Sequence, residues 1–432
     1  MPFICALNLL VDIYILDLLV IGLLLLTITL GSGWISRLPL SYALIYLIVG
    51  IILSPYGFNL IQIRPDTELL ERVSEFVVLI SLFSCGLKMT RPPRLWAWNS
   101  TIRLIGLLMP ISIFAIAAIG HWMLNLDWGA SILLGAILAP TDPVLASEVQ
   151  LYDPTDRDEL RFGLTSEGGL NDALAFPFVY FGLRSLENPN WQEWFREWVV
   201  VDLLWAIFAG MVMGYAVAKA VRWIDYRLQL HRPADSLIED FVALSTVLIA
   251  YSLTELVHGY GFLAVFVAGV TMKRRRNQDK ALSQLHFIER LEKLSEIGAI
   301  LLLGSLLRHE PILRFGTNAL TIAIPLLFLI RPLGAWVSTI GLPVHPATRW
   351  LYGWFGIRGV GSLYYLAYAL GEGLKGDIGE QIAWITFVTI VLSVILHGIS
   401  STPLMNWYER HVEGNTTIEH ESSQQTEEAE AG

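Results

Sequence analysis

Two short polar sequences interrupt long apolar stretches of this chain, and both carry a carboxylate. Residues 139–143 read Ala-Pro-Thr-Asp-Pro, and residues 167–173 read Glu-Gly-Gly-Leu-Asn-Asp-Ala. A charge near the middle of a lipid bilayer costs several kcal/mol, so a carboxylate kept there marks a candidate functional site. Non-helical backbone is tolerated at that depth only where it lines a cavity or is buried in protein. Together the two sequences indicate an ion site.

In the first sequence, Thr141 and Asp142 lie between two prolines. Pro140 and Pro143 each remove a backbone N–H donor and clash with the preceding turn, so nearby carbonyl oxygens lose their helical partners. These carbonyls and the Thr141 hydroxyl are suitable ligands for a hard monovalent cation, and the carbonyl end of a half-helix favours positive charge. A proline kink capped by Thr141 and Asp142 is the structural alternative, but the intramembrane charge favours an ion site.

In the second sequence, Glu167 and Asn171 are four residues apart and therefore share one face of a helix. Asp172 follows, about 100° further round the helix. Burial in a medium of low dielectric constant favours the neutral form of a carboxyl group. We therefore expect Asp172 to bind either a proton or a cation, and the two to compete for it.

Two arginines also lie within apolar stretches: Arg331 in Leu-Ile-Arg-Pro-Leu-Gly, and Arg358 in Gly-Ile-Arg-Gly-Val-Gly at 356–361. A buried guanidinium stays charged, so each must have a partner. We expect Arg331 to pair with Glu167 and to neutralise helix-end charge, and we group Arg358 with this structural ion pair, in the same role at its own break. A structural role is favoured over direct transport for both.

The composition predicts the class of protein. The chain is 54% hydrophobic and 16% charged with a mean hydropathy of +0.55, whereas soluble proteins carry about 25% charged residues. Apolar segments of roughly 18–22 residues recur, the length that spans a bilayer as a helix. We expect an all-α polytopic membrane protein with about thirteen transmembrane helices, at roughly 12–30, 38–56, 68–88, 102–124, 129–150, 160–184, 199–223, 237–258, 260–272, 285–307, 317–341, 347–370 and 381–405.

Charge distribution predicts the orientation. Basic residues gather in every second loop, including Lys-Arg-Arg-Arg at 273–276, which places the N-terminus outside and the C-terminus in the cytoplasm. Residues 413–432 are polar and acidic and are expected to be a disordered cytoplasmic tail. Glu296 lies near a span end, where contact with the membrane interface is expected. The acidic loop from Asp153 to Glu159 could attract cations, but a solvated loop is favoured.

The remaining features exclude several classes. Basic residues form no groove-like patch, so nucleic acid is not an expected partner. Cys5 and Cys85 imply neither a disulfide nor a metal framework, and no cofactor is expected.

Breaks occur in two separate spans, 129–150 and 347–370. Such paired interruptions predict inverted repeats with two discontinuous crossing helices.

These motifs resemble the NhaP-like branch of the monovalent cation/proton antiporters, which also holds the eukaryotic sodium/hydrogen exchangers. The resemblance rests on Thr-Asp-Pro at 141–143, Glu-Gly-Gly-Leu-Asn-Asp at 167–172, Arg331 with Pro-Leu-Gly, and Gly-Ile-Arg-Gly at 356–359. It implies a transmembrane antiporter domain over 1–412, with a core domain in the spans of roughly 68–184 and 285–370 and dimerisation through the others. It also implies a homodimer with alternating access in a prokaryotic plasma membrane.

The resemblance also assigns roles. Asp172 matches the carboxylate that binds the cation and the proton, and Asn171 matches the neighbour typical of electroneutral members. Thr141 and Asp142 match the pair in the unwound helix, so Asp172 and Thr141 are the expected metal ligands. Many members carry an acidic residue before Gly-Leu in the third span, whereas this chain has Ser84 in Leu-Phe-Ser-Cys-Gly-Leu at 82–87. Ser84 offers an oxygen without a charge, which leaves the cation preference open.

The leading hypothesis is therefore a secondary transporter, not an enzyme. It would exchange Na⁺, or alternatively Li⁺ or K⁺, for H⁺ by electroneutral antiport. A potassium/proton antiporter or a cation-efflux channel of the same fold is the alternative, although no carbonyl-lined filter repeat is visible. An intramembrane aspartyl protease with Asp142 and Asp172 as its dyad is a third hypothesis. The expected aspartyl-protease motifs are missing from the sequence.

Overall fold

The computed structural model describes residues 40–54, 57–58, 67–89, 91–92, 94–152, 155–188, 190–229, 236–272 and 278–413, with a few single positions between 15 and 30. Over these residues the protein is helical and contains no strand. Most of the expected first span at 12–30 lies outside them. The basic sequence at 273–276 and the acidic tail after 413 also lie outside the described residues.

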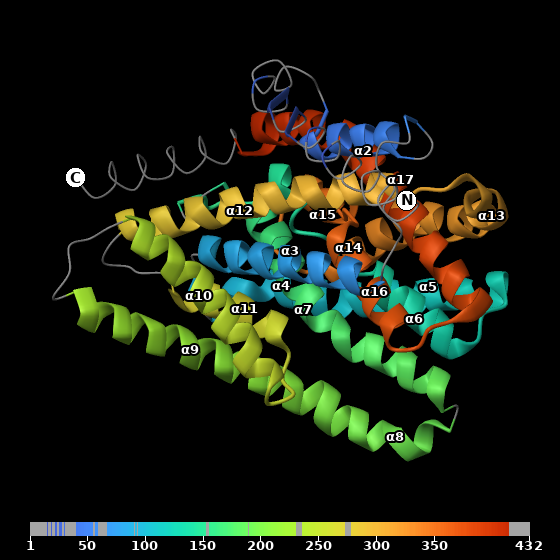
Figure 1. Ribbon diagram of the computed structural model, residues 1–432, viewed down its shortest axis with the longest axis horizontal. Helices are drawn as coiled ribbons and strands as arrows, with labels where there is room; N and C mark the ends of the chain where they lie inside the picture. The colour runs from blue at the N-terminus through green and yellow to red at the C-terminus, as the bar shows by residue number, and fades with distance from the viewer. Residues whose placement is uncertain are drawn as a thin grey trace, which may run out of the picture.

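Most of the chain forms long helices joined by short connections (Figure 1). The helices are α2 (Tyr42–Leu53), α3 (Thr67–Lys88), α4 (Asn99–Arg103), α5 (Met109–Leu124), α6 (Trp128–Leu138), α7 (Glu159–Glu187), α8 (Trp191–Glu197), α9 (Ala206–Gln229), α10 (Ser236–Glu255), α11 (Gly261–Met272), α12 (Gln278–Ser305), α13 (His309–Pro325), α14 (Arg331–Ser338), α15 (Pro346–Trp354), α16 (Val360–Gly371) and α17 (Gly376–Tyr408).

Several neighbouring helices are continuous because a π-helical segment joins them, as Trp198–Trp205 joins α8 to α9 and Leu326–Ile330 joins α13 to α14. Four continuous helices of the described chain are long and apolar enough to cross a membrane: Leu95–Leu124, Trp191–Leu228, Glu310–Ser338 and Gly376–Val412. Three shorter helices, α2, α6 and α11, are also apolar. The expected total of about thirteen spans remains a prediction.

Two expected spans are not continuous helices. The segment expected at 129–150 is helical only to Leu138, and the segment expected at 347–370 is split into α15 and α16. Proline and glycine explain both interruptions: Pro140 and Pro143 follow the end of α6, and Gly356 and Gly359 lie between α15 and α16. The two discontinuous helices are therefore present, whereas an inverted repeat remains a prediction.

The helices pack in two neighbouring groups. Helices α5, α6 and α7 pack in sequence, and α13 packs on α17. On the other side, α11 packs on both α9 and α3, and α12 packs on α2 and α3. Figure 1 shows the helix formed by α8 and α9 along one edge of the molecule, with α10 and α11 beside it. Contacts of α3 with α16 and α7 join the two groups near the breaks.

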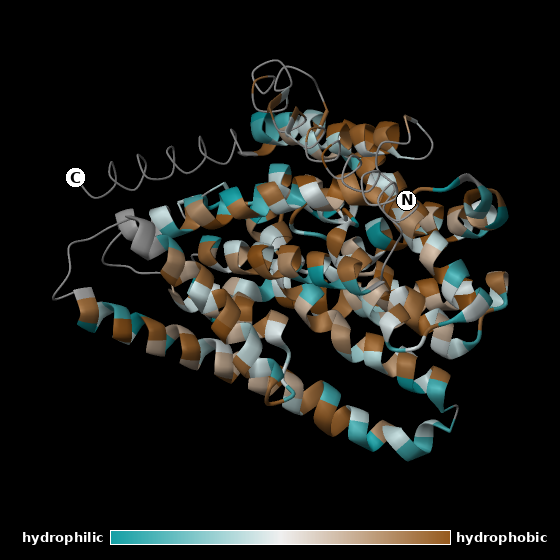
Figure 2. Ribbon diagram, viewed as in Figure 1, coloured by the Kyte–Doolittle hydropathy of each residue, from teal (hydrophilic) through white to brown (hydrophobic). Residues whose placement is uncertain are grey.

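The surface reflects a membrane environment. Large apolar side chains are exposed along the helices that form the outside of the bundle, including Phe208, Met211 and Tyr215 on α9. Figure 2 shows hydrophobic residues through the middle of the α8–α9 helix and hydrophilic residues toward its α8 end. Apolar surface of this kind is stable against lipid tails rather than water, so the helix is suited to lie within a bilayer.

Candidate functional site

The two interrupted helices meet where both lose helical structure. After Leu138 the chain runs without a regular helix through residues 139–146, and residues 355–359 separate α15 from α16. The two segments are hydrogen-bonded to each other, since the backbone N–H of Asp142 donates to the carbonyl oxygen of Ile357 at 2.8 Å. The C-terminal ends of α6 and α15 and the N-terminal end of α16 therefore lie next to this contact.

Asp142 binds the N-terminal end of α16. Its side chain is 2% exposed. Oδ1 accepts a hydrogen bond from the backbone N–H of Val144 at 2.7 Å, and Oδ2 accepts one from the N–H of Val360, the first residue of α16. The unpaired N–H groups at a helix N-terminus carry a partial positive charge that a carboxylate neutralises. Asp142 is therefore fully engaged by backbone donors.

Arg358 binds the C-terminal end of α6, where a positive side chain meets the negative end of a helix. The residue is 0% exposed. Its Nε donates to the carbonyl oxygen of Leu138 at 2.9 Å, its Nη2 to that of Ala139 at 3.4 Å, and its Nη1 to that of Gly356. The guanidinium thereby neutralises the negative end of the α6 dipole.

This arrangement corrects the grouping of Arg358 with the Glu167 ion pair. Within the described residues, Arg358 has no carboxylate at ion-pair distance, and the acceptors of its side chain are backbone carbonyl oxygens. The physical reason is that α6 ends directly beside it, so the last carbonyls of that helix supply the negative partner.

Glu167 and Arg331 form a buried pair. Both side chains are 2% exposed. Arg331 Nη1 donates to Glu167 Oε1 at 2.8 Å and Nη2 to Oε2 at 2.9 Å. The Nη2 atom also donates to the carbonyl oxygen of Tyr352, at the C-terminal end of α15, at 3.1 Å. Two parallel charge-assisted bonds of this kind hold α7, α14 and α15 in a fixed geometry.

Asp172, in contrast, has a carboxylate without a hydrogen-bond partner in the part of the chain that the structure describes. The residue is 1% exposed, and neither Oδ1 nor Oδ2 has a hydrogen-bond partner among the described residues. Nearby, Asn171 Nδ2 donates to Thr141 Oγ1 at 2.8 Å, and Asn171 Oδ1 is buried with no hydrogen-bond partner among the described residues. A buried ionised carboxylate without a partner is strongly unfavourable. Asp172 is therefore suited to hold a proton or a cation.

The backbone of α16 approaches this carboxylate closely. A Cβ atom at Gly361 would lie 2.5 Å from Oδ1 of Asp172, so a larger residue there would require the carboxylate to shift. Asp142 is near enough to Asp172 to interact with it electrostatically. The structure thus brings Thr141, Asp142, Asn171 and Asp172 to one place, at the N-terminal end of α16.

Ser84 lies on α3, outside the crossing itself. It is buried, and its Oγ atom has no hydrogen-bond partner among the residues described. The adjacent Cys85 packs against α7, since a Cβ atom at Gly169 would lie 3.3 Å from the Cβ of Cys85. Ser84 therefore lies close to the Asp172 region without any contact that identifies it as a ligand.

The sequence analysis missed a set of buried charges on α12. Glu296 was expected near the membrane interface but is 2% exposed and forms an ion pair with Lys293 at 2.7 Å. One turn earlier, Glu292 accepts a hydrogen bond from Ser81 Oγ at 2.6 Å. The signal is present in the sequence: charges at 289, 292, 293 and 296 recur with helical spacing and share one face.

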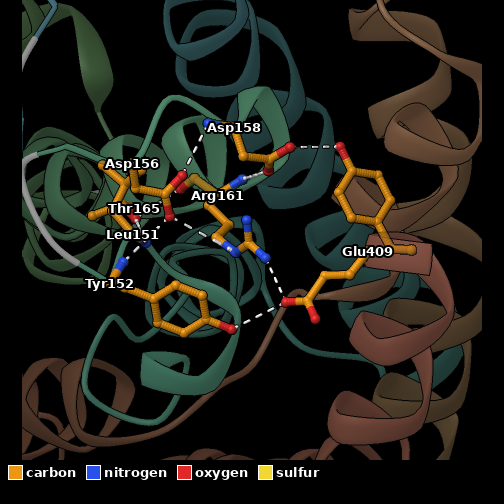
Figure 3. Close-up of polar contacts among 8 residues, drawn as sticks. Leu151, Tyr152, Asp156, Asp158, Arg161, Thr165 and Glu409 are labelled. Atoms are coloured by element: carbon orange, nitrogen blue, oxygen red, sulfur yellow. Dashed lines mark hydrogen bonds and ion pairs between the residues drawn. The ribbon is translucent and has the colours of Figure 1, made fainter. Parts of the chain in front are cut away.

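A second polar cluster lies at the N-terminal end of α7 (Figure 3). We call it the α7–α17 clasp; its residues are Tyr152, Asp156, Asp158, Arg161, Tyr408 and Glu409. Arg161 Nη2 contacts Glu409 Oε1 at 2.5 Å, and the Tyr408 hydroxyl donates to Asp158 Oδ2 at 2.9 Å. The clasp joins the loop after the first break to the end of α17.

The clasp corrects the expectation of a purely solvated acidic loop. Arg161 is buried, and Asp158 Oδ1 accepts its backbone N–H at 2.8 Å as the cap of α7. Burial raises the pKa of the Asp158 carboxyl, and hydrogen bonds from the Arg161 backbone and the Tyr408 hydroxyl lower it in part. Figure 3 shows the carboxylates of Asp156 and Asp158 beside Arg161.

A buried acceptor at the crossing of two broken helices, in an all-helical membrane protein, is the arrangement of an ion-translocating membrane protein. A family model described as "Sodium/hydrogen exchanger, transmembrane" matches residues 21–407. The chain belongs to this family of transporters.

Curated relatives include the K⁺/H⁺ antiporter NhaP of Alkalimonas amylolytica, 28% identical over 92% of this chain and 67% of that protein. The K⁺/H⁺ antiporter NhaP2 of Shewanella oneidensis is 25% identical over 85% of this chain and 62% of its own length. The chain thus spans about two thirds of the length of these relatives.

The fold is also that of a solved structure. The sodium proton antiporter MjNhaP1 from Methanocaldococcus jannaschii at pH 8 superposes with a TM-score of 0.68 at 22% identity, covering 90% of this chain and 98% of that one. At this identity the likeness establishes the antiporter fold and not the transported ion.

Proposed function

We propose that the protein exchanges a monovalent cation for protons across the membrane, with both ions competing for Asp172. The observation that carries this proposal is the Asp172 carboxylate, which is buried and has two unpartnered oxygens beside the ends of two broken helices. A single group that must be either protonated or cation-bound couples the two fluxes, because neither ion can occupy it together with the other. The names of the relatives agree with this class of transport.

The surrounding oxygens define how the cation would be held. Asp172 would supply the charge, and Asn171 Oδ1 the nearest neutral oxygen without a partner. Thr141 is proposed as a second ligand through its hydroxyl, which already accepts a hydrogen bond from Asn171. With an amide at 171 in place of a second carboxylate, we propose one-for-one electroneutral exchange. Na⁺ is the proposed cation, with Li⁺ as a further substrate.

The larger assembly is part of the same proposal. A core of roughly 68–184 and 285–370 would move against the remaining spans in alternating access, within a homodimer of about thirteen spans per chain. The N-terminus would lie outside and the C-terminus in the cytoplasm of a prokaryotic plasma membrane.

The test uses purified full-length protein in proteoliposomes loaded with acid. Addition of Na⁺, Li⁺ or K⁺ outside should release internal protons from vesicles with the wild-type chain, and Asp172→Asn should abolish the release. Asp202→Asn is the matched control, because Asp202 also lies in an apolar helix but is paired with Arg184 at 3.0 Å. Sustained exchange by Asp172→Asn would refute the proposal.

Potassium/proton antiport is the second candidate, because two curated relatives carry that name. In the same vesicles, proton release by K⁺ at lower concentrations than by Na⁺ would favour it. Conductance distinguishes a channel from a carrier. Single-channel currents in a planar bilayer would indicate a pore, whereas a saturating flux without such currents would indicate a carrier.

A further inference from the structure

Helices α3 and α12 each carry a row of polar side chains, here called a stripe, on the face that contacts the other helix. Residues spaced by three or four positions lie on one face of a helix. On α3 the stripe consists of Ser81, Ser84, Cys85 and Lys88, and on α12 of Glu289, Glu292, Lys293 and Glu296. Helices α3 and α12 pack directly on each other, and their contact surface is rich in charge.

Two contacts align the stripes. Ser81 Oγ donates to Glu292 Oε1 at 2.6 Å, and Lys88 Nζ pairs with Glu289 Oε1 at 3.0 Å. Residue numbers therefore rise along α3 as they fall along α12, so the helices are antiparallel here. Ser84 lies one turn beyond Ser81, beside the same Glu292 carboxylate.

Glu292 differs from its neighbours in charge compensation. Lys88 pairs with Glu289, and Lys293 pairs with Glu296 at 2.7 Å. Glu292 is buried, and within the described residues it has no ion pair; its one hydrogen-bond donor by geometry is the Ser81 hydroxyl. Lys88 interacts with it electrostatically but is already bound to Glu289. Glu292 is therefore the one carboxylate of the α12 stripe without an ion pair among the described residues.

Ser84, which lies beside the Glu292 carboxylate, also has an unused hydrogen-bonding group among the described residues. Ser84 is 1% exposed, and its Oγ has no hydrogen-bond partner in the described part of the chain. A buried hydroxyl without a partner is unfavourable unless something binds it. A carboxylate and a free hydroxyl oxygen on facing helices are the kind of oxygen donors that an alkali cation accepts.

Glu292 and Ser84 lie next to the Asp172 site. Cys85, next to Ser84, interacts electrostatically with Glu292 as well as with Asp172 and Asp142. Glu296 likewise lies within electrostatic range of both Glu292 and Asp142. The edge of α3 that carries Ser84 and Cys85 therefore separates Glu292 from Asp172.

We propose that Glu292 and Ser84 form a staging site for the transported monovalent cation, next to the Asp172 site. The charge missing at residue 84 of α3 is supplied from α12. This inference rests on the proposed exchange function. Glu292 raises the local cation concentration and passes the ion along the α3 edge toward Asp172.

The test compares apparent KM and kcat for Na⁺-driven proton release in proteoliposomes. Two unit charges about 10 Å apart at an effective dielectric constant of about 20 predict a roughly fifteenfold higher KM for Glu292→Gln, with kcat within about twofold. The double variant Ser84→Glu/Glu292→Gln, which returns the carboxylate to α3, should restore KM to within about twofold of wild type.

Two further variants separate ion binding from folding. Ser84→Ala removes a hydroxyl that lies beside Glu292 and has no other interaction among the described residues, so folding should suffer little, whereas a cation ligand predicts a KM about two- to threefold higher. Glu75→Gln is the control for loss of a buried carboxylate on α3, because its oxygen can still accept the Tyr251 hydroxyl. Its KM should stay at the wild-type value.

The outcomes are distinguishable. If the wild-type chain releases no protons on cation addition, the proposed function fails and this inference fails with it. If the wild-type chain exchanges and Asp172→Asn does not, but Glu292→Gln and Ser84→Ala keep the wild-type KM, the staging site alone is refuted. Failure of Ser84→Glu to lower the raised KM of Glu292→Gln would also overturn it.

Discussion

The two helix breaks carry opposite charges and serve opposite helix ends. At the first break, Asp142 binds the positive N-terminus of α16, which belongs to the second break. At the second break, Arg358 binds the carbonyl end of α6, which belongs to the first. Each break therefore supplies the side chain that neutralises a helix end of the other. Neither broken helix is electrostatically complete alone.

The comparison separates two aspartates that look alike in the sequence. Asp142 and Asp172 are both buried, but backbone N–H groups occupy both oxygens of Asp142, whereas those of Asp172 have no partner among the residues that the structure describes. A proton-sharing dyad of the protease type needs two carboxylates that face each other with free oxygens. The geometry of Asp142 does not fit that role, and it favours a cap for Asp142 and an exchange site at Asp172.

The largest effect is expected when the second break loses its charge. Arg358→Met keeps the length of the side chain but leaves the carbonyl end of α6 buried without donors. Removing one partner of a buried charged contact costs roughly 3–5 kcal/mol. We expect a strongly lowered unfolding temperature in detergent, or loss of folded protein on size-exclusion chromatography. A wild-type unfolding temperature would show that α6 does not depend on Arg358.

A smaller effect is expected at the first break. Asp142→Asn keeps one acceptor oxygen for α16 but replaces the other with a donor that faces a backbone N–H. The loss should be about 1–3 kcal/mol in stability. Measured in the same detergent, its unfolding temperature should lie between those of wild type and Arg358→Met. If Asp142→Asn lowered the unfolding temperature more than Arg358→Met, the proposed difference between the two breaks would be refuted.

Gly361→Ala tests whether the cation binds beside the Asp172 carboxylate. The added Cβ would lie 2.5 Å from Oδ1 of Asp172, in the space where an ion would bind. We expect a roughly tenfold loss of cation-driven proton release, with a stability cost of about 1–3 kcal/mol from overpacking. Ser362→Ala, one residue further along α16, is the control. Equal exchange by both variants would place the ion elsewhere.

The smallest effect is expected in the α7–α17 clasp. Tyr408→Phe removes the hydroxyl that donates to Asp158 Oδ2 at 2.9 Å. One such bond contributes about 0.5–1.5 kcal/mol, and water can replace it at this partly exposed carboxylate. The unfolding temperature should fall slightly and exchange should be retained. Complete loss of exchange would instead make the clasp part of the transport path.

The sequence was informative about which residues interrupt the helices, and less so about their partners. Prolines 140 and 143 and the glycines around Arg358 predicted both breaks, because these residues act on the local backbone. Neutralisation of helix-end charge was expected for Arg358, but that this end belongs to α6 was not predictable, because Leu138 lies 220 residues away along the chain. The burial of Glu296 was missed because proximity to a span end does not reveal which helix covers it.

What the sequence alone determined is therefore local: an all-helical membrane protein, two breaks, and an intramembrane carboxylate at each polar motif. Composition and backbone chemistry act over one or two helical turns, so they need no knowledge of the neighbours. The tertiary structure decided which carboxylate is capped and which is free. That choice depends on where the ends of α6 and α16 lie relative to Asp142 and Asp172, and only packing of helices distant in the chain places them there.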